Sequence, residues 1–94
     1  MKMGETTKIL GHTYTVEMDK NILDYGDSHG MVFFLDQRIV INPNAPDSIQ
    51  LQAFVHEIIE VAKERLELDI EHSTIQALGE VIAQALTSNN LLKK

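Results

Sequence analysis

Hydrophobic and polar residues follow two different periods along this chain, and the change falls in the segment Asn-Pro-Asn-Ala-Pro-Asp at residues 42–47. Before it, Tyr14, Val16 and Met18 alternate with threonine and glutamate, which is typical of a half-buried strand. After it, apolar residues recur at steps of three and four, as on one face of a helix. Prolines and turn-forming residues separate the two patterns. We therefore expect one domain over residues 1–94, strand-rich over 8–42 and helical over 47–88.

The first half predicts a small antiparallel sheet of about three strands. Residues 8–18 form the first strand, with a bend or turn at Gly11-His12. Residues 21–30 are dense in turn-forming types and predict an irregular loop. The short apolar runs 31–35 and 38–42 are separated only by Asp36 and Gln37, so a tight hairpin is expected there.

The second half predicts two packed helices. The first begins near Asp47 or Ser48, either of which could cap a helix N-terminus, and it runs to about Leu66. Its apolar stripe comprises Leu51, Val55, Ile58, Ile59, Ala62 and Leu66, and its polar face comprises Gln52, His56, Glu60, Lys63, Glu64 and Glu67. The second helix follows a break at residues 67–69, with Asp69 or Ser73 as its cap. It ends within residues 87–90, and its apolar stripe comprises Ile75, Leu78, Ile82 and Leu86, which His72 extends by one turn. The expected fold class is α+β.

Composition limits the kinds of site that this chain can build. It contains no cysteine, four histidines, and 14 acidic against eight basic residues. Without thiolates, a metal site must use imidazole and carboxylate ligands. A net charge of −6 with scattered basic residues argues against nucleic acid as a partner. No apolar run approaches the roughly 20 residues of a membrane span, and residues 1–7 lack the apolar stretch of a signal peptide. We expect a soluble cytoplasmic protein with no membrane partner.

The sequence His-Glu-Ile-Ile-Glu at residues 56–60 contains the best candidates for chemistry. Residues four apart share one helix face, so His56 and Glu60 are placed to bind one metal ion. Glu57 is rotated from His56 by about 100°, where a general base would flank the ion without binding it. A catalytic zinc usually takes three protein ligands. His72, at the start of the second helix and on its apolar stripe, is expected to face the first helix and to be the third ligand.

Each of these residues also has an ordinary interpretation. His56 and Glu60 would equally lie on a solvated helix face, where an exposed ion pair contributes only a few tenths of a kcal/mol. Glu57 would then be a surface carboxylate. His72 would be a histidine at a helix N-terminus, satisfied by Glu60 or by a backbone carbonyl. The other two histidines of the chain are expected in a surface strand or turn and in a loop; they are His12 and His29.

The strand Arg38-Ile-Val-Ile-Asn42, the proline-bearing turn and the helix carrying Phe54-Val-His-Glu-Ile-Ile-Glu60 together resemble the zincin-like metallopeptidase core. The resemblance covers about residues 30–86 and is nearest to short forms among phage and mobile-element proteins, in which a strand of type I-x-I-N precedes a His-Glu-x-x-His helix. It implies that His56 is a zinc ligand and Glu57 the general base, and that the strand 38–42 is a sheet edge along which an extended peptide lies. Glu60 stands where the family has its second histidine. Either this carboxylate replaces the imidazole and His72 restores the histidine count, or the site has lost its metal.

These features predict a zinc-dependent hydrolase that acts on peptide or similar amide bonds. The metal, Zn²⁺ or another divalent ion, would be held by His56, Glu60 and His72, with Glu57 as general base. A chain this short leaves little surface for a substrate pocket, so a homo-oligomer could supply a missing wall around the peptide or protein substrate. The alternative is a non-catalytic accessory or scaffold protein of phage or prophage type, in which the metal is structural or lost.

Overall fold

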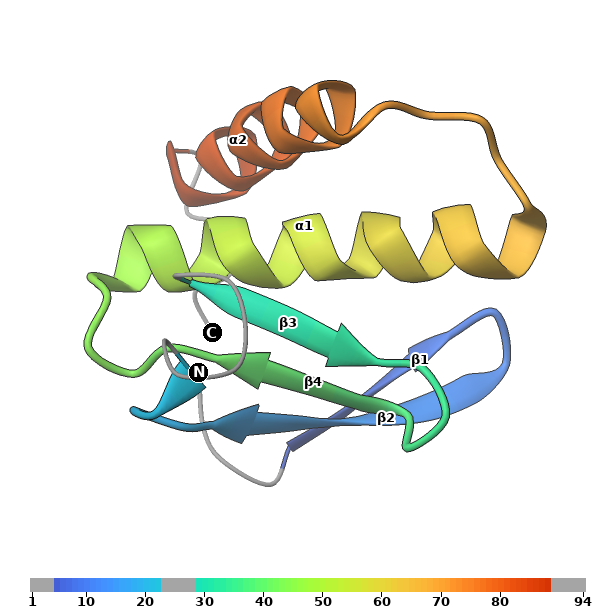
Figure 1. Cartoon of the computed structure of the whole chain (residues 1–94). Helices are drawn as coiled ribbons and strands as arrows, with labels where there is room; N and C mark the ends of the chain where they lie inside the picture. The colour runs from blue at the N-terminus through green and yellow to red at the C-terminus, as the bar shows by residue number, and fades with distance from the viewer. Residues whose placement is uncertain (1–4, 23–28, 89–94) are drawn as a thin grey trace.

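Four strands form one sheet, and two helices are stacked on one side of it (Figure 1). The structure is a computed structural model that describes residues 5–22 and 29–88. The elements in chain order are β1 (Glu5–Ile9), β2 (His12–Met18), β3 (Gly30–Phe33), β4 (Arg38–Ile41), α1 (Asp47–Leu66) and α2 (His72–Ser88). The sheet, α1 and α2 make three successive layers, with α1 in the middle. The predicted α+β class, a small sheet followed by two packed helices, is confirmed.

The sheet is mixed, and not antiparallel throughout as expected, with the strand order β1-β2-β4-β3. The pairs β1–β2 and β3–β4 are antiparallel, whereas β2 and β4 run parallel, with Val16 opposite Ile39. The sheet has one strand more than expected because residues 5–18 form a hairpin of two strands. The parallel pair arises because the chain goes from β2 to the far edge of the sheet before it returns to β4. Of the loop predicted over residues 21–30, residues 23–28 lie outside the described part of the chain.

The turn between β1 and β2 consists of Leu10 and Gly11. Both have positive φ, 51° and 82°, which is the conformation of a type I′ turn, the form that matches the twist of a two-residue hairpin. Glycine adopts this conformation without steric cost, whereas leucine does not. The turn predicted at Gly11-His12 is therefore found one residue earlier, and it joins two strands.

The main core lies between the sheet and α1. Alternate residues of the two central strands face the helix and are buried there; they are Tyr14, Val16, Ile39 and Ile41, and they pack with Ala53 and Val61 of α1. The hydroxyl oxygen of Tyr14 accepts hydrogen bonds from Nε and Nη2 of Arg65, at 3.2 and 3.1 Å. These bonds tie β2 to the C-terminal end of α1 and so help to set how the helix crosses the sheet.

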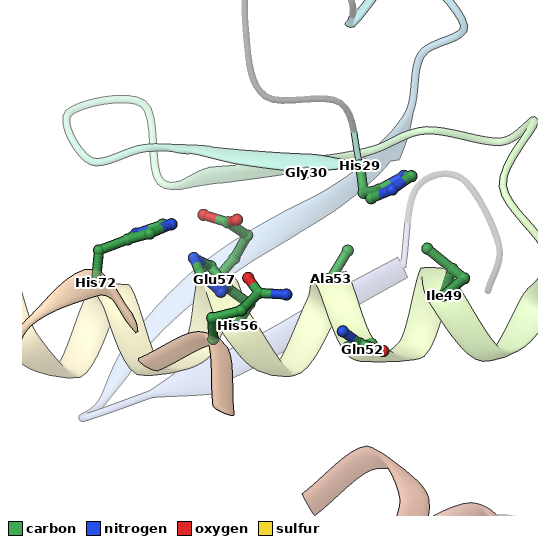
Figure 2. Close-up of a pocket in the computed structure, with 9 residues that line it drawn as sticks. His29, Gly30, Ile49, Gln52, Ala53, His56, Glu57 and His72 are labelled. Atoms are coloured by element: carbon green, nitrogen blue, oxygen red, sulfur yellow. The ribbon is translucent and has the colours of Figure 1, made fainter. Parts of the chain in front are cut away.

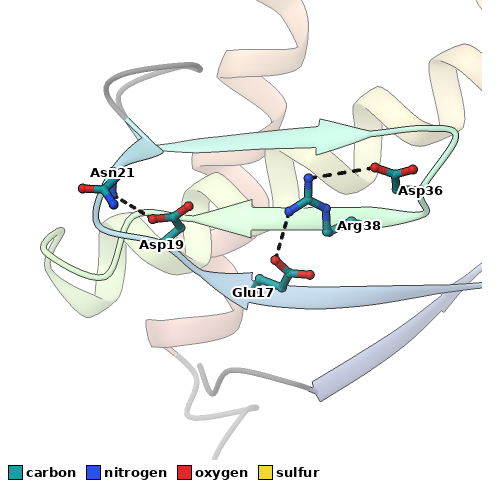
Figure 3. A network of polar contacts seen from close by, with 5 residues as sticks. All are labelled: Glu17, Asp19, Asn21, Asp36 and Arg38. Atoms are coloured by element: carbon teal, nitrogen blue, oxygen red, sulfur yellow. Dashed lines mark hydrogen bonds and ion pairs between the residues drawn. The ribbon is translucent and has the colours of Figure 1, made fainter.

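Arg38 lies on the other face of the sheet (Figure 3). Its Nη1 is 3.1 Å from Oε1 of Glu17 on β2, its Nη2 is 3.9 Å from Oδ2 of Asp36, and its guanidinium carbon is 4.3 Å from the ring centroid of Phe33. Arg38 therefore bridges the strands on either side of β4. Because β4 pairs with β2 and with β3, it is an interior strand. The expectation that residues 38–42 form a sheet edge is wrong, and the edge strands are β1 and β3.

α1 spans Asp47–Leu66, close to the predicted bounds. Its N-cap is Pro46, without a side-chain capping bond, so neither of the expected caps is used. Instead, Nε2 of Gln50 donates to the carbonyls of Pro43 and Ala45, at 3.2 and 2.9 Å, and anchors the preceding turn. Its C-cap is Glu67, whose backbone has the left-handed conformation, with φ 52° and ψ 46°.

Burial along α1 follows its position between two layers. Its buried residues are Gln50, Ala53, Val55, His56, Glu57 and Val61, so polar and apolar faces are both covered. Leu66, placed on the predicted apolar stripe, is 53% exposed at the end of the helix. The single apolar stripe expected from the periodicity is therefore incomplete, because α2 covers part of the face that the pattern assigned to solvent.

α2 contacts α1 through Ile75, Gly79 and Ala83, which are its buried residues. Leu78 and Ile82, expected on the buried stripe, are 43% and 41% exposed. The two helices approach closely at Gly79. The buried face of α2 therefore contains its small residues, Gly79 and Ala83. The helix begins at His72, so Ser73 is already inside it and Asp69 lies before its first turn. Within the described residues, no helix combines the length and apolar character needed to cross a membrane.

Candidate metal centre

Two histidines and one glutamate meet where α1 and α2 touch. His56 and Glu60 lie one turn apart on α1, with His56 Nε2 3.3 Å from Glu60 Oε2. His72, the first residue of α2, places its Nδ1 3.4 Å from the same oxygen. The two imidazole rings are 4.9 Å apart between centroids and inclined by 65°. The structure thus brings together the three residues that the sequence predicts as ligands.

Two of the three separations within this group match those of a small divalent metal site. With metal–ligand distances of about 2.1 Å, two ligand atoms of a tetrahedral zinc lie about 3.4 Å apart. Both separations from Glu60 match this value. All three ligand atoms lie within 4.8 Å of one another, so even the widest pair needs to close by only about 1.4 Å. His72 can make that movement because its side chain is 65% exposed.

Burial separates the site from an ordinary helix surface. His56 is 8% exposed, so its interpretation as part of a solvated helix face is wrong. The side chain of Glu60 is 24% exposed, and His72 covers one side of the group from α2. His72 faces the first helix as expected, but it lies at the surface rather than in the interior. A metal here would have two sheltered ligands on a rigid helix and one accessible ligand.

Glu57 is also buried, at 5% exposed, which contradicts its interpretation as a surface carboxylate. It points from α1 towards the start of β3, where a Cβ added to Gly30 would lie 3.4 Å from its Cγ and its Oε2. The same added Cβ would lie 3.3 Å from Cβ of Ala53, so Gly30 allows β3 to come close to α1 at both residues. Burying a carboxylate is costly, and such residues are common where a protein performs acid–base chemistry.

A cleft of about 240 Å³ runs along α1 beside this group. Its lining residues are His29, Gly30, Ile49, Gln52, Ala53, His56, Glu57, His72 and Gln76. His72, His56 and Glu57 lie towards one end of the cleft, and His29 and Ile49 lie towards the other (Figure 2). The candidate base and two candidate ligands therefore face one space that a small substrate segment could enter.

Sequence reasoning did not single out the two glutamines of this cleft. A signal was present, because Gln52 precedes His56 by the same four-residue step that separates His56 from Glu60, and Gln76 follows His72 by four residues. Residues at this spacing share a helix face, so both amides fall beside the candidate ligands. The spacing could not show that residues of the two helices line one cleft.

The remaining histidines differ in their relation to the site. His12 is exposed at the β1–β2 turn, opposite Ile9 in the strand register, and is not among the cleft residues. His29 is exposed too, but it lines the cleft. Its carbonyl accepts a hydrogen bond of 2.9 Å from the backbone N–H of Asn42, which fixes the backbone of His29 beside the end of β4.

Comparison with known proteins adds no relative. No family model matches the chain, and neither the curated proteins nor the solved structures contain a significant match. The resemblance to the zincin-like core therefore rests on the short motifs alone. Any assignment of function must be argued from the residues of the site, their separations and their burial.

Proposed function

We propose that this protein is a zinc-dependent hydrolase of peptide or similar amide bonds, with the metal held by His56, Glu60 and His72. The observation that carries the proposal is the position of Glu60 Oε2, 3.3 Å from one imidazole nitrogen and 3.4 Å from another. Two imidazoles and one carboxylate form the ligand set of a thermolysin-type catalytic zinc, which keeps a further position open. This set suits Zn²⁺ better than the harder Mg²⁺ or Ca²⁺.

Glu57 is the general base in this proposal. When bound, zinc polarises an amide carbonyl and makes water more acidic. Glu57 takes the proton from the attacking water and passes it to the leaving amine. It lines the same cleft as His56 and His72 but does not belong to the ligand group, so in this proposal it acts on the water and does not bind the metal. Gln52 and Gln76 line the same cleft, and in this proposal their side chains orient the substrate.

β3 is the strand along which an extended substrate would lie. Among the strands of the described residues it pairs with β4 alone, and its first residue, Gly30, lines the cleft beside Glu57. An edge strand presents unpaired backbone groups, and adding a peptide to such an edge is a common mode of recognition. The peptide-binding role that the resemblance implied for residues 38–42 is therefore proposed for residues 30–33. A peptide in this position would bring one amide bond to the end of the cleft that holds Glu57.

Metal analysis of untagged protein is the first test. We expect about one zinc per folded chain in the wild type and a clear loss in His56→Ala, Glu60→Ala and His72→Ala. The matched control is His12→Ala, which removes an exposed histidine outside the cleft and should leave the zinc content unchanged. Less than about 0.2 zinc per chain in well-folded wild type would refute the proposal.

Turnover is the second test, with Glu57→Gln as the informative variant. Cleavage of a mixed peptide library, followed by mass spectrometry, should show hydrolysis by the zinc-loaded wild type. Glu57→Gln should retain its zinc and lose about 10²- to 10⁴-fold in rate, because only proton transfer is removed. An unchanged rate would contradict the general-base assignment.

A structural, non-catalytic metal is the second candidate, and one observation favours it. The three candidate ligands come from two helices, so an ion bound there would also join α1 to α2. In that case zinc would be present in the wild type and Glu57→Gln would change neither zinc content nor any hydrolysis rate. If zinc is absent, the same contacts are simply ion pairs of His56 and His72 with Glu60.

A further inference from the structure

α2 approaches α1 closely but buries few of its own apolar side chains there. It lies on α1, on the side away from the sheet (Figure 1). Its buried residues are Ile75, Gly79 and Ala83, and two of these three offer almost no side-chain apolar area. Because the hydrophobic contribution grows with the apolar area buried, these buried residues of α2 add little hydrophobic stabilisation to the contact.

Three other large apolar residues of α2 are only partly covered. Leu78, Val81 and Ile82 are 43%, 65% and 41% exposed. The connection from α1, residues 67–71, is exposed except for Ile70, which is half-buried. Segments with few buried contacts open at low free energy. We therefore expect α2 to separate from α1 more readily than α1 separates from the sheet.

The candidate metal centre lies across this weak contact. His56 and Glu60 belong to α1, whereas His72 belongs to α2, and the contact between Glu60 and His72 crosses from one helix to the other. Metal–ligand bonds to all three residues exist only when α2 is in place. An ion that binds one state of a protein more tightly than another shifts the equilibrium towards that state.

We propose that metal binding controls the docking of α2: the bound ion holds α2 against α1, and the metal-free chain releases it. This inference rests on the metal site of the proposed function. It has a consequence for that function, because His72 and Gln76 are the residues of α2 that line the cleft. Release of α2 removes this wall, so the metal-free protein lacks both the ion and a complete substrate cleft.

The size of the effect follows from linkage. An ion that requires the docked state raises the ratio of docked to released α2 by a factor of about 1 + [Zn²⁺]/Kd, which is about 100 at one hundred times Kd. The coupling is reciprocal, so a change that weakens docking must lower the zinc affinity by the same factor. Both directions can be measured on the full chain.

Hydrogen exchange followed by mass spectrometry tests the first direction. With zinc at one hundred times Kd, amides of residues 72–88 should exchange about 100-fold more slowly than in EDTA, whereas amides of β2 and β4 should change far less. His72→Ala should lose this slowing, and His12→Ala should keep it. Calorimetric titration with Zn²⁺ on the same samples measures binding independently. If zinc binds and the exchange of residues 72–88 does not change, the inference is overturned and the metal site stands. If zinc does not bind, both are overturned.

The reciprocal test weakens docking without touching a ligand. A Cβ on Gly79 would already lie 3.6 Å from backbone atoms of Gln52 and His56, so the longer side chain of Gly79→Leu must push α2 away from α1. We expect its zinc affinity to fall at least tenfold. Ala77→Leu, at an exposed position of the same helix, is the control and should bind like the wild type. Exchange of the β2 and β4 amides reports whether the variant has folded. Wild-type affinity in folded Gly79→Leu would overturn the inference.

Discussion

Replacing Gly79 by alanine should stabilise the protein by about 1 kcal/mol. Glycine inside a helix costs about 0.8–1.0 kcal/mol relative to alanine, and Gly79 lies well within α2. It is buried against α1, and an added Cβ would meet the carbonyl oxygen of Gln52 and the backbone N and Cα of His56 at 3.6 Å. This is ordinary van der Waals contact, so no overlap offsets the gain. For a domain of this size, 1 kcal/mol raises Tm by roughly 4–8 °C.

Ala77→Gly provides the matched reference for this measurement. Ala77 is exposed on the same helix, so its replacement by glycine reports helix propensity alone. Thermal unfolding of zinc-saturated protein, followed by circular dichroism, should show that Gly79→Ala gains at least as much as Ala77→Gly loses. A smaller gain, or a loss, would mean that the added methyl group collides with α1. The clearance of 3.6 Å at Gly79 would then be wrong.

Three further predictions concern the frame around the site. Tyr14→Phe should lower the free energy of unfolding by about 1–2 kcal/mol, because its hydroxyl accepts two hydrogen bonds from Arg65; in a double-mutant cycle, adding Arg65→Met should cost little more, and full additivity would contradict this pairing. Leu10→Asn should gain about 1 kcal/mol in urea unfolding, since asparagine tolerates a φ of 51° better than leucine; a loss would refute the assigned turn. Gly30→Ala should lower kcat and keep the zinc content, because a Cβ there lies 3.3 Å from Cβ of Ala53 and 3.4 Å from Glu57, and so shifts α1 or this carboxylate; an unchanged kcat would show that β3 does not orient this base.

The candidate site was predictable to different extents. His56 and Glu60 are close because of helix geometry, so their proximity follows once the helix is recognised. The approach of His72 needs one more condition, that the connection 67–71 folds α2 back on α1, and its short length favours this outcome. The burial of Glu57 was not predictable, because it depends on β3 lying beside α1 at Gly30.

The hydrophobic pattern likewise could not predict that β4 lies in the interior of the sheet. A strand of type Ile-Val-Ile is apolar on both faces, and it reads the same at an edge or in the middle of a sheet. Strand order decides between the two, and it depends on where the chain goes between β2 and β3. The proposed substrate strand is therefore residues 30–33, at the sheet edge, and not residues 38–42.

The sequence by itself determined the types of element, their approximate bounds and the three candidate ligands, because periodicity, turn residues and four-residue spacing are local properties of the backbone. The tertiary structure decided the parallel pairing of β2 with β4, the burial of Glu57, and the use of Gly79 and Ala83 rather than Leu78 and Ile82 against α1. These features depend on which surfaces of the elements meet. Because α1 is covered on two sides, its sequence has no single apolar stripe that would reveal those surfaces. The wall that α2 adds to the cleft, with His72 on it, exists only in the folded chain.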